Sequence, residues 1–244
     1  MQFNDFFELC SQIFAANEGL PTLGEKEAEK LFLLTERMLK VNESMNLTAI
    51  KQEHAIILRH YADSLTVSKH LDEGARIIDV GCGAGFPTLP LAIFRPDLEI
   101  TALDSTAKRT EYVRSTAELL GLANVNTVAA RAEELANLKE YRESFDYATA
   151  RAVAALPILT ELCLPFVRVG GRFVAMKAQR AAEELSLSSG AIQKCGGRLE
   201  NAIPEPLFDT DGTSESRTII IIHKTSPTPK EFPRHFSKIS KKPL

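Results

Sequence analysis

A short apolar segment followed by three closely spaced glycines constrains the fold of this chain more than any other feature. The segment 76–80 reads RIIDV, and Gly81, Gly83 and Gly85 follow it, with Pro87 and a further apolar stretch behind them. Apolar runs of this kind are typical of buried parallel strands, and proline is favoured in the first turn of a helix. Because glycine adopts backbone angles closed to other residues and admits a ligand close to the main chain, the stretch predicts a strand, a tight binding loop and a helix.

The spacing of the glycines indicates the kind of ligand. Dinucleotide-binding loops read G-x-G-x-x-G, whereas this chain reads G-x-G-x-G and has Phe86 in the place of the last glycine. With Asp79 two residues before the first glycine, the loop resembles the S-adenosylmethionine (SAM) loop of Rossmann-like methyltransferases. The alternative is a glycine-rich turn without a ligand, because short motifs also occur by chance. A nicotinamide-dependent enzyme is the least favoured interpretation, because Phe86 is bulky.

A second apolar segment, 99–105, ends near an acid that suits a ribose. Asp104 lies 23 residues after Gly81, and nucleotide-binding units place an acid about 20 residues on to bind the ribose hydroxyls. We therefore predict that Asp104 binds the ribose of the cofactor. The alternative is that Asp104 caps the following helix.

The rest of the chain alternates predicted strands and helices after an all-helical beginning. Further strands are predicted at 125–130, 145–150, 172–177, 199–207 and 218–223, and helices at 3–17, 25–41, 53–71, 106–120, 156–167 and 178–190. This pattern predicts the α/β class, with a mostly parallel seven-stranded sheet, helices on both faces and an N-terminal helical extension. With the resemblance of the glycine loop to a SAM loop, it implies a Rossmann-like, class I SAM-dependent methyltransferase fold. The last two strands should form an antiparallel hairpin. We expect a helical cap at 1–73, a SAM-binding core at 74–226 and a basic tail at 227–244.

The residues singled out so far should meet at one edge of the sheet. Gly81 to Phe86 follow the first strand, Asp104 ends the second, Ala132-Glu133 follow the third and Arg151 follows the fourth. Ligands of open α/β sheets bind outside the carboxyl ends of the strands. Four successive strand ends therefore predict one crevice.

Charge is unevenly distributed along the chain. The net charge is −3, but the tail 227–244 carries five basic residues against one acid, a balance of +4 that leaves −7 on the remainder. A basic tail on an acidic body favours a polyanionic partner reached by one face, although a solvated, disordered terminus is an equal alternative. The four cysteines form no CxxC pair, there is no long apolar run, and the N-terminus lacks a basic leader. We expect a cytoplasmic protein without a metal or a membrane segment.

The segment after the fourth strand narrows the choice of methyl acceptor. It reads ATARAVA, so the Asn/Asp-Pro-Pro-aromatic motif of enzymes that methylate exocyclic amines is absent. The Pro-Cys nucleophile of enzymes that methylate pyrimidine carbon is absent too, and we interpret Cys82 and Cys163 as packing residues. A ring nitrogen with a free lone pair needs neither device. A small-molecule SAM enzyme and a non-catalytic nucleotide-sensing module remain alternatives.

A long, ordered set of motifs resembles the bacterial RsmG family, also called glucose-inhibited division protein B. The similar stretches are Asn46-Leu47-Thr48, His60 with Asp63-Ser64, DVGCGAGFPTLPLA, Asp104-Ser105, Arg131-Ala132-Glu133, TARAVA, Lys177 and the final Lys-Lys-Pro-Leu. The resemblance implies a 16S rRNA guanine-N7 methyltransferase that uses SAM and acts on one guanosine of the decoding region. Thr88 and Cys82 depart from the residues common in the family without threatening the loop.

The resemblance and the chemistry together predict the site. By resemblance, Gly81 and Phe86 should contact SAM, Ala132 and Glu133 should flank its adenine, and Arg151 should lie near the cofactor and the target base. Because N7 must stay free to attack, Arg151 should bind a phosphate, guanine O6 or the SAM carboxylate. The amides of Gly83 and Gly85 can face the methionine carboxylate, and Phe86 can cover the sulfonium. Transfer to guanine N7 removes no proton, so catalysis should rest on positioning, without a general base.

Contacts with RNA should come from basic residues, because phosphate contacts dominate affinity for nucleic acid. Positioning candidates are Arg151, His60 and Lys177. RNA-binding candidates are Arg109, Lys177, Arg234, Lys238, Lys241 and Lys242. The alternatives for His60, Lys177 and Arg109 are a cap histidine, a charge at a strand end and a solvated helix face. Phe86 or Tyr61 could stack on the target base, unless they belong to the core. We expect 16S rRNA or the small subunit as partner, and a monomer.

Overall fold

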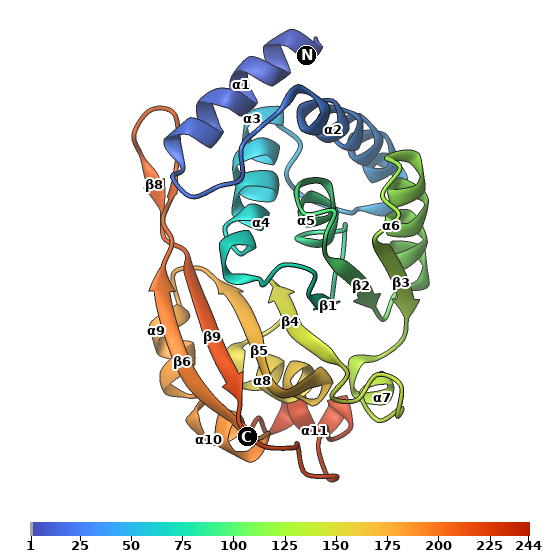
Figure 1. The fold of residues 1–244 in the computed structure, drawn as a ribbon, viewed down its shortest axis with the longest axis vertical. Helices are drawn as coiled ribbons and strands as arrows, with labels where there is room; N and C mark the ends of the chain where they lie inside the picture. Colours follow the sequence, from blue (N-terminus) through green and yellow to red (C-terminus); the bar gives the residue numbers. More distant parts are fainter. Residues whose placement is uncertain (1) are drawn as a thin grey trace.

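The computed structural model describes residues 2–244 and is built around a seven-stranded sheet of order β3-β2-β1-β4-β5-β9-β6 (Figure 1). The strands are β1 (Arg76–Val80), β2 (Glu99–Asp104), β3 (Val125–Ala129), β4 (Phe145–Arg151), β5 (Val167–Lys177), β6 (Gly197–Pro204) and β9 (Thr218–Lys224). The first five are parallel, whereas β9 runs antiparallel to both β5 and β6. The predicted sheet and its closing hairpin are confirmed. Met1 of the predicted cap lies outside the described residues.

Helices cover both faces of the sheet and bury a separate apolar core on each. In β9, Ile219 and Ile221 pack into one core, and Ile220 and Ile222 pack into the other. This alternation follows from the two-residue period of a strand, so a run of four isoleucines fits a strand buried on both faces. The first core receives α5 (Thr88–Phe94), α6 (Ala107–Leu119) and the N-terminal helices. The second receives α7 (Ala132–Leu135), α8 (Leu156–Cys163), η3 (Leu164–Phe166), α9 (Ala181–Ser186), α10 (Ser189–Lys194) and α11 (Phe236–Lys241).

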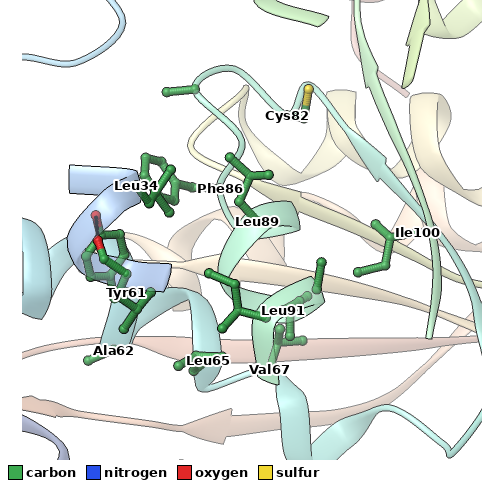
Figure 2. Packing of buried hydrophobic residues seen from close by; sticks show 14 of the residues in the cluster. Leu34, Tyr61, Ala62, Leu65, Val67, Cys82, Phe86, Leu89, Leu91 and Ile100 are labelled. Atoms are coloured by element: carbon green, nitrogen blue, oxygen red, sulfur yellow. Dashed lines mark hydrogen bonds between the residues drawn. The ribbon is translucent and has the colours of Figure 1, made fainter. Parts of the chain in front are cut away.

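The N-terminal helices form a layer against the glycine loop and α5. Helices α1 (Phe3–Ala16) and α2 (Glu25–Met45) are followed by α3 (Glu53–Ile56), a π-helical turn η1 (Ile57–Ala62), α4 (Asp63–Leu65) and a 3₁₀ turn η2 (Ser68–His70). Figure 2 shows Leu34 beside Phe86 and Leu65 near Leu91 of α5, and the Tyr61 ring centroid lies 6.1 Å from that of Phe86. The cap therefore shares one core with the sheet.

Several predicted boundaries differ from the structure. The continuous helix expected at 53–71 is divided by η1, and the helix expected at 178–190 is two short helices. The strand expected at 199–207 ends at Pro204, and Leu207 begins β7 (Leu207–Phe208), which pairs with β8 (Ser214–Glu215) in a separate hairpin. Proline has no N–H for a ladder, which suits the end of a strand. None of the helices in residues 2–244 is long and apolar enough to span a membrane.

The basic segment 227–244 is packed on the core. Arg142 donates hydrogen bonds to the carbonyls of Thr228, Pro229 and Phe232, and Ile239 in α11 is fully buried. The disordered terminus offered as an alternative is therefore not what the structure shows. The segment presents its charges from a fixed position.

Candidate active site

The carboxyl ends of β1 to β4 meet at an open cleft with a volume of about 420 Å³. The predicted residues that line it are Gly81, Gly83, Phe86, Asp104, Ala132, Glu133, Arg151, His60 and Arg109. The sheet order reverses between β1 and β4, so the cleft lies at the switch point, where open α/β sheets bind ligands. The structure thus brings the predicted strand-end residues into one crevice.

The glycine loop is held by backbone hydrogen bonds. The amides of Gly81 and Cys82 both donate to the carbonyl of Leu103, at 2.7 and 2.9 Å. Gly85 has a φ of +87°, and a Cβ there would lie 2.5 Å from Leu89 Cδ1, so this glycine lets the loop pack on α5. Gly85 does not line the cleft, and its amide donates to the carbonyl of Cys82 at 2.8 Å. The amide expected to face a ligand carboxylate is therefore occupied within the loop.

Asp104 is buried at the end of β2 and joins the loop to the next helix. Its Oδ2 accepts from the amide of Gly83 at 3.1 Å, and its Oδ1 accepts from the amide of Thr106 at 2.8 Å. The Gly83 amide is thus also engaged in this structure, contrary to the expected contact with a carboxylate. Thr106, not Asp104, occupies the cap position of α6. Each carboxylate oxygen keeps a second lone pair, so Asp104 can still accept from two ribose hydroxyls.

His60, Phe86 and Arg151 form a stack at the cleft. The rings of His60 and Phe86 lie 4.4 Å apart at 10°, and the Arg151 guanidinium carbon lies 5.4 Å from the Phe86 centroid. His60 Nε2 lies 2.9 Å from the hydroxyl oxygen of Thr48. Burial, followed by the charge of Arg151, lowers the pKa of His60 to about 3. The imidazole is therefore neutral near pH 7.

Two aromatic residues offered as partners for the base differ in placement. Tyr61 is fully buried, and its hydroxyl lies 2.6 Å from that of Thr35, so it belongs to the core. Phe86 is 5% exposed and lines the cleft between His60 and Arg151. Of the two, only Phe86 lines the cleft.

Asp79 supports the loop from below. The hydroxyls of Thr88 and Thr149 donate to its two carboxylate oxygens, at 2.6 and 3.2 Å. Burial raises the pKa of Asp79 to about 6, against these hydrogen bonds and the charge of Arg151. Thr88, which departs from the family pattern, thus ties α5 to β1. In the sequence, Asp79 is noticed only as part of the SAM-loop motif. Its position as the one acid among the apolar residues of its strand could have indicated a buried structural role.

Known proteins share the part of the sequence that forms most of this cleft. The profile of a family described as rRNA small subunit methyltransferase G matches residues 27–204, which include the cleft residues from His60 to Arg151. The chain belongs to this family. The ribosomal RNA small subunit methyltransferase G of Deinococcus radiodurans is 47% identical over 205 residues, covering 83% of this chain and 80% of that protein.

Solved structures support the fold of this methyltransferase G family member. A SAM-dependent methyltransferase from Methanosarcina mazei has a TM-score of 0.51 and 15% identity, covering 66% of this chain and 97% of its own. The [4+2]-cyclase SpnF has a TM-score of 0.56 and 16% identity, covering 86% and 99%. Because a cyclase and a methyltransferase share the fold, fold likeness alone does not decide the reaction.

Residues of α7 and of the C-terminal segment also line the cleft. Ala132 and Glu133 begin α7 and line the cleft, and Glu133 is 5% exposed. Phe236 of α11 lines it too, with the Arg131 guanidinium carbon 5.3 Å from its ring centroid. Sequence reasoning missed Phe236, because an aromatic residue within a basic tail forms no recognisable motif.

The remaining predicted residues lie away from the cleft. Lys177 is 9% exposed and donates to the carbonyl of Ala154 at 2.9 Å and to Glu184 at 2.7 Å. Arg234 forms three hydrogen bonds with the carboxylate of the fully buried Glu161, two from its guanidinium and one from its main-chain amide. These two cations therefore have structural partners. Three tail lysines are exposed in or beside α11, namely Lys238, Lys241 and Lys242.

Within residues 2–244, no group of three or more histidine, cysteine, aspartate or glutamate side chains could hold an ion. The four cysteines are free and buried, and burial raises the pKa of each thiol. Inert packing suits such thiols better than nucleophilic catalysis.

Proposed function

We propose that this chain transfers the methyl group of SAM to N7 of one guanosine in the decoding region of 16S rRNA. The main support for the proposal is the family match across residues 27–204. The matched range includes the residues at the strand ends that line the cleft. The partner is 16S rRNA or the small ribosomal subunit. We further propose a monomer that acts in the cytoplasm.

The residues of the cleft fit SAM. The buried carboxylate of Asp104 suits the ribose hydroxyls, and Ala132 with Glu133 suits the adenine. The two amides expected for the methionine carboxylate are engaged elsewhere. Arg151 offers a better group, because a guanidinium pairs with carboxylates in a forked geometry. When bound, SAM supplies a methyl group on a cationic sulfur.

The chemistry at guanine N7 places few demands on the protein. The nitrogen attacks with its own lone pair and loses no proton, so the reaction requires alignment and not a base. His60, neutral near pH 7, adds no positive charge where the guanine ring becomes cationic. Phe86 provides an apolar surface beside the path of transfer.

Binding of RNA requires cations around the cleft. The Arg109 side chain is 45% exposed at the cleft and lies 3.6 Å from Asp104. The exposed Lys238, Lys241 and Lys242 belong to the same segment as Phe236, which reaches the cleft. We propose these four as contacts with phosphate groups. Lys177 and Arg234 have protein partners and act on RNA only indirectly in this proposal.

A methyl-transfer assay tests the proposal. The protein is mixed with labelled SAM and either small subunits or naked 16S rRNA from a strain that lacks the gene. The product is mapped by mass and by chain cleavage specific for 7-methylguanosine. Label at one guanosine N7 is the expected result, and the better of the two substrates defines the partner. Label on another atom, or no transfer while SAM still binds, would reject the proposal.

A further inference from the structure

Five charged residues form a closed ring of hydrogen bonds beside the cleft. Asp63 accepts from Arg151 Nη1 at 3.0 Å and from Arg217 Nε at 3.1 Å. Glu215 accepts from Arg217 Nη2 at 2.8 Å and from Arg59 Nε at 2.6 Å. The carbonyl of Arg59 then accepts from Arg151 Nη1 at 2.9 Å, which closes the ring. A substitution at one of the five residues should therefore change the positions of the other side chains in the ring.

The ring joins three parts of the chain that are distant in sequence. Arg59 lies in η1 and Asp63 begins α4, Arg151 ends β4, and Glu215 ends β8. The amide of Asp63 bonds the carbonyls of Leu58 and His60 and bypasses that of Arg59, which accepts from Arg151. The π-helical turn is thus part of the arrangement, in keeping with the frequent occurrence of such turns at functional sites.

The ring orients one group of the cleft. Arg151 Nη1 is fully engaged, by the Asp63 carboxylate and the Arg59 carbonyl, and the guanidinium lies over Phe86. Within residues 2–244, the Nε and Nη2 donors of Arg151 have no acceptor. The side chains of Asp63 and Arg151 are only 10% and 12% exposed. Hydrogen bonds between charged groups are strong in such surroundings, so the free donors of Arg151 are held in one direction.

We propose that Asp63 is a positioning residue for methyl transfer, acting through Arg151, and that Arg217 and Glu215 hold Asp63 in place. This inference rests on the proposed function. Asp63 fixes where the free donors of Arg151 point and also compensates its charge. Without that carboxylate, the guanidinium would lose its fixed direction, and less of its charge would be compensated near a guanine ring that becomes positive during the reaction. Loss of Asp63 should therefore slow transfer even when SAM and RNA are saturating.

The experiment is a double-mutant cycle on single-turnover methyl transfer. Asp63→Asn is expected to lower the rate at least tenfold at saturating SAM and substrate. Arg151→Gln alone should also slow the reaction, because glutamine lacks both the fork and the charge. In the Arg151→Gln background, Asp63→Asn should lower the rate less than threefold further, since Asp63 then has no guanidinium to orient or to compensate. A purely structural role for Asp63 would lower the rate by the same factor in both backgrounds.

A matched control separates this effect from the loss of an ion pair in general. Asp97→Asn removes the partner of Arg95, a pair with a 2.7 Å contact outside the cleft, and should leave the rate unchanged. If Asp63→Asn does not fold, Glu215→Gln at the outer end of the ring should lower the rate two- to fivefold, again only with Arg151 present. An unchanged rate in either folded variant, or equal factors in both backgrounds, overturns the inference. A wild-type protein that transfers no methyl to 16S rRNA overturns the proposed function instead.

Discussion

Replacement of Gly81 by alanine should damage stability and SAM binding by separable amounts. Gly81 has a φ of +78°, and a Cβ there would lie 2.5 Å from Val153 Cγ2 and 3.1 Å from Cγ1. The backbone conformation alone costs an alanine about 1–2 kcal/mol. Val153 is 42% exposed and lines the cleft, so it can move, but it then shifts the wall of the cleft. We expect the free energy of unfolding to fall by about 2 kcal/mol and the affinity for SAM to fall at least tenfold, or about 1.4 kcal/mol.

Gly74 provides the matched control. It has a φ of +69°, and a Cβ there would meet nothing within 4 Å. Gly74→Ala should therefore lose about 1–2 kcal/mol from strain alone and bind SAM as the wild type does. Adding Val153→Ala to Gly81→Ala should remove the clash and recover part of the lost affinity. Urea unfolding measures the first quantity, and calorimetric titration with SAM measures the second.

Either of two results would contradict this prediction. Gly81→Ala could bind SAM as tightly as the wild type, in which case the loop does not contact the cofactor. Alternatively, Gly74→Ala could weaken SAM binding as much as Gly81→Ala, and then strain rather than position would account for the loss.

Three further predictions concern charge. Burial raises the pKa of Asp79 from 3.8 to about 6, so the folded state binds this proton more tightly than the unfolded state does. The free energy of unfolding should therefore fall as pH rises from about 4 to about 6, by on the order of 3 kcal/mol in total. Asp79→Asn should abolish this pH dependence, measured by urea unfolding between pH 4 and 7. The prediction is contradicted if the variant loses stability with pH as steeply as the wild type. Glu161→Gln removes the partner of a buried ion pair and should cost about 3 kcal/mol in the same assay, whereas a loss below about 1 kcal/mol would show that the pair is dispensable. Changing Lys238, Lys241 and Lys242 to glutamine should weaken RNA binding and reduce its log–log salt slope by about 2–3, and an unchanged slope would remove these lysines from the interface.

The sheet and the position of the cleft could be predicted because their signals are local. A run such as TIIII in β9 is apolar on both faces, and the structure buries Ile219 to Ile222 on both. The glycine spacing and Asp104 lie within one strand–loop–helix unit and the strand after it. The rule that ligands bind at the carboxyl ends of parallel strands then brings them together without knowledge of long-range contacts.

The role of a charged side chain could not be predicted from the sequence where its ion-pair partner lies on another element. Lys177 and Arg234 are charged residues near apparent functional segments, yet Glu184 and Glu161 pair with them. Glu161, within the apolar helix LPILTELC, was the available sign that a cation had to reach it, because a fully buried carboxylate needs a partner. The π-helical turn leaves the apolar pattern of its helix almost unchanged, so periodicity predicts a continuous helix there.

The distribution of charge explains how the cleft can serve methyl transfer without a general base. A base poised near pH 7 would be useful only if a proton had to leave the acceptor, and N7 of guanine has none to lose. The site accordingly holds its imidazole neutral: burial beside a guanidinium lowers the pKa of His60 to about 3. That guanidinium, Arg151, is in turn paired with Asp63 at 3.0 Å. The surface next to Phe86 therefore adds little positive charge where the guanine ring must become a cation. The free donors of Arg151 remain available to hold an anionic group.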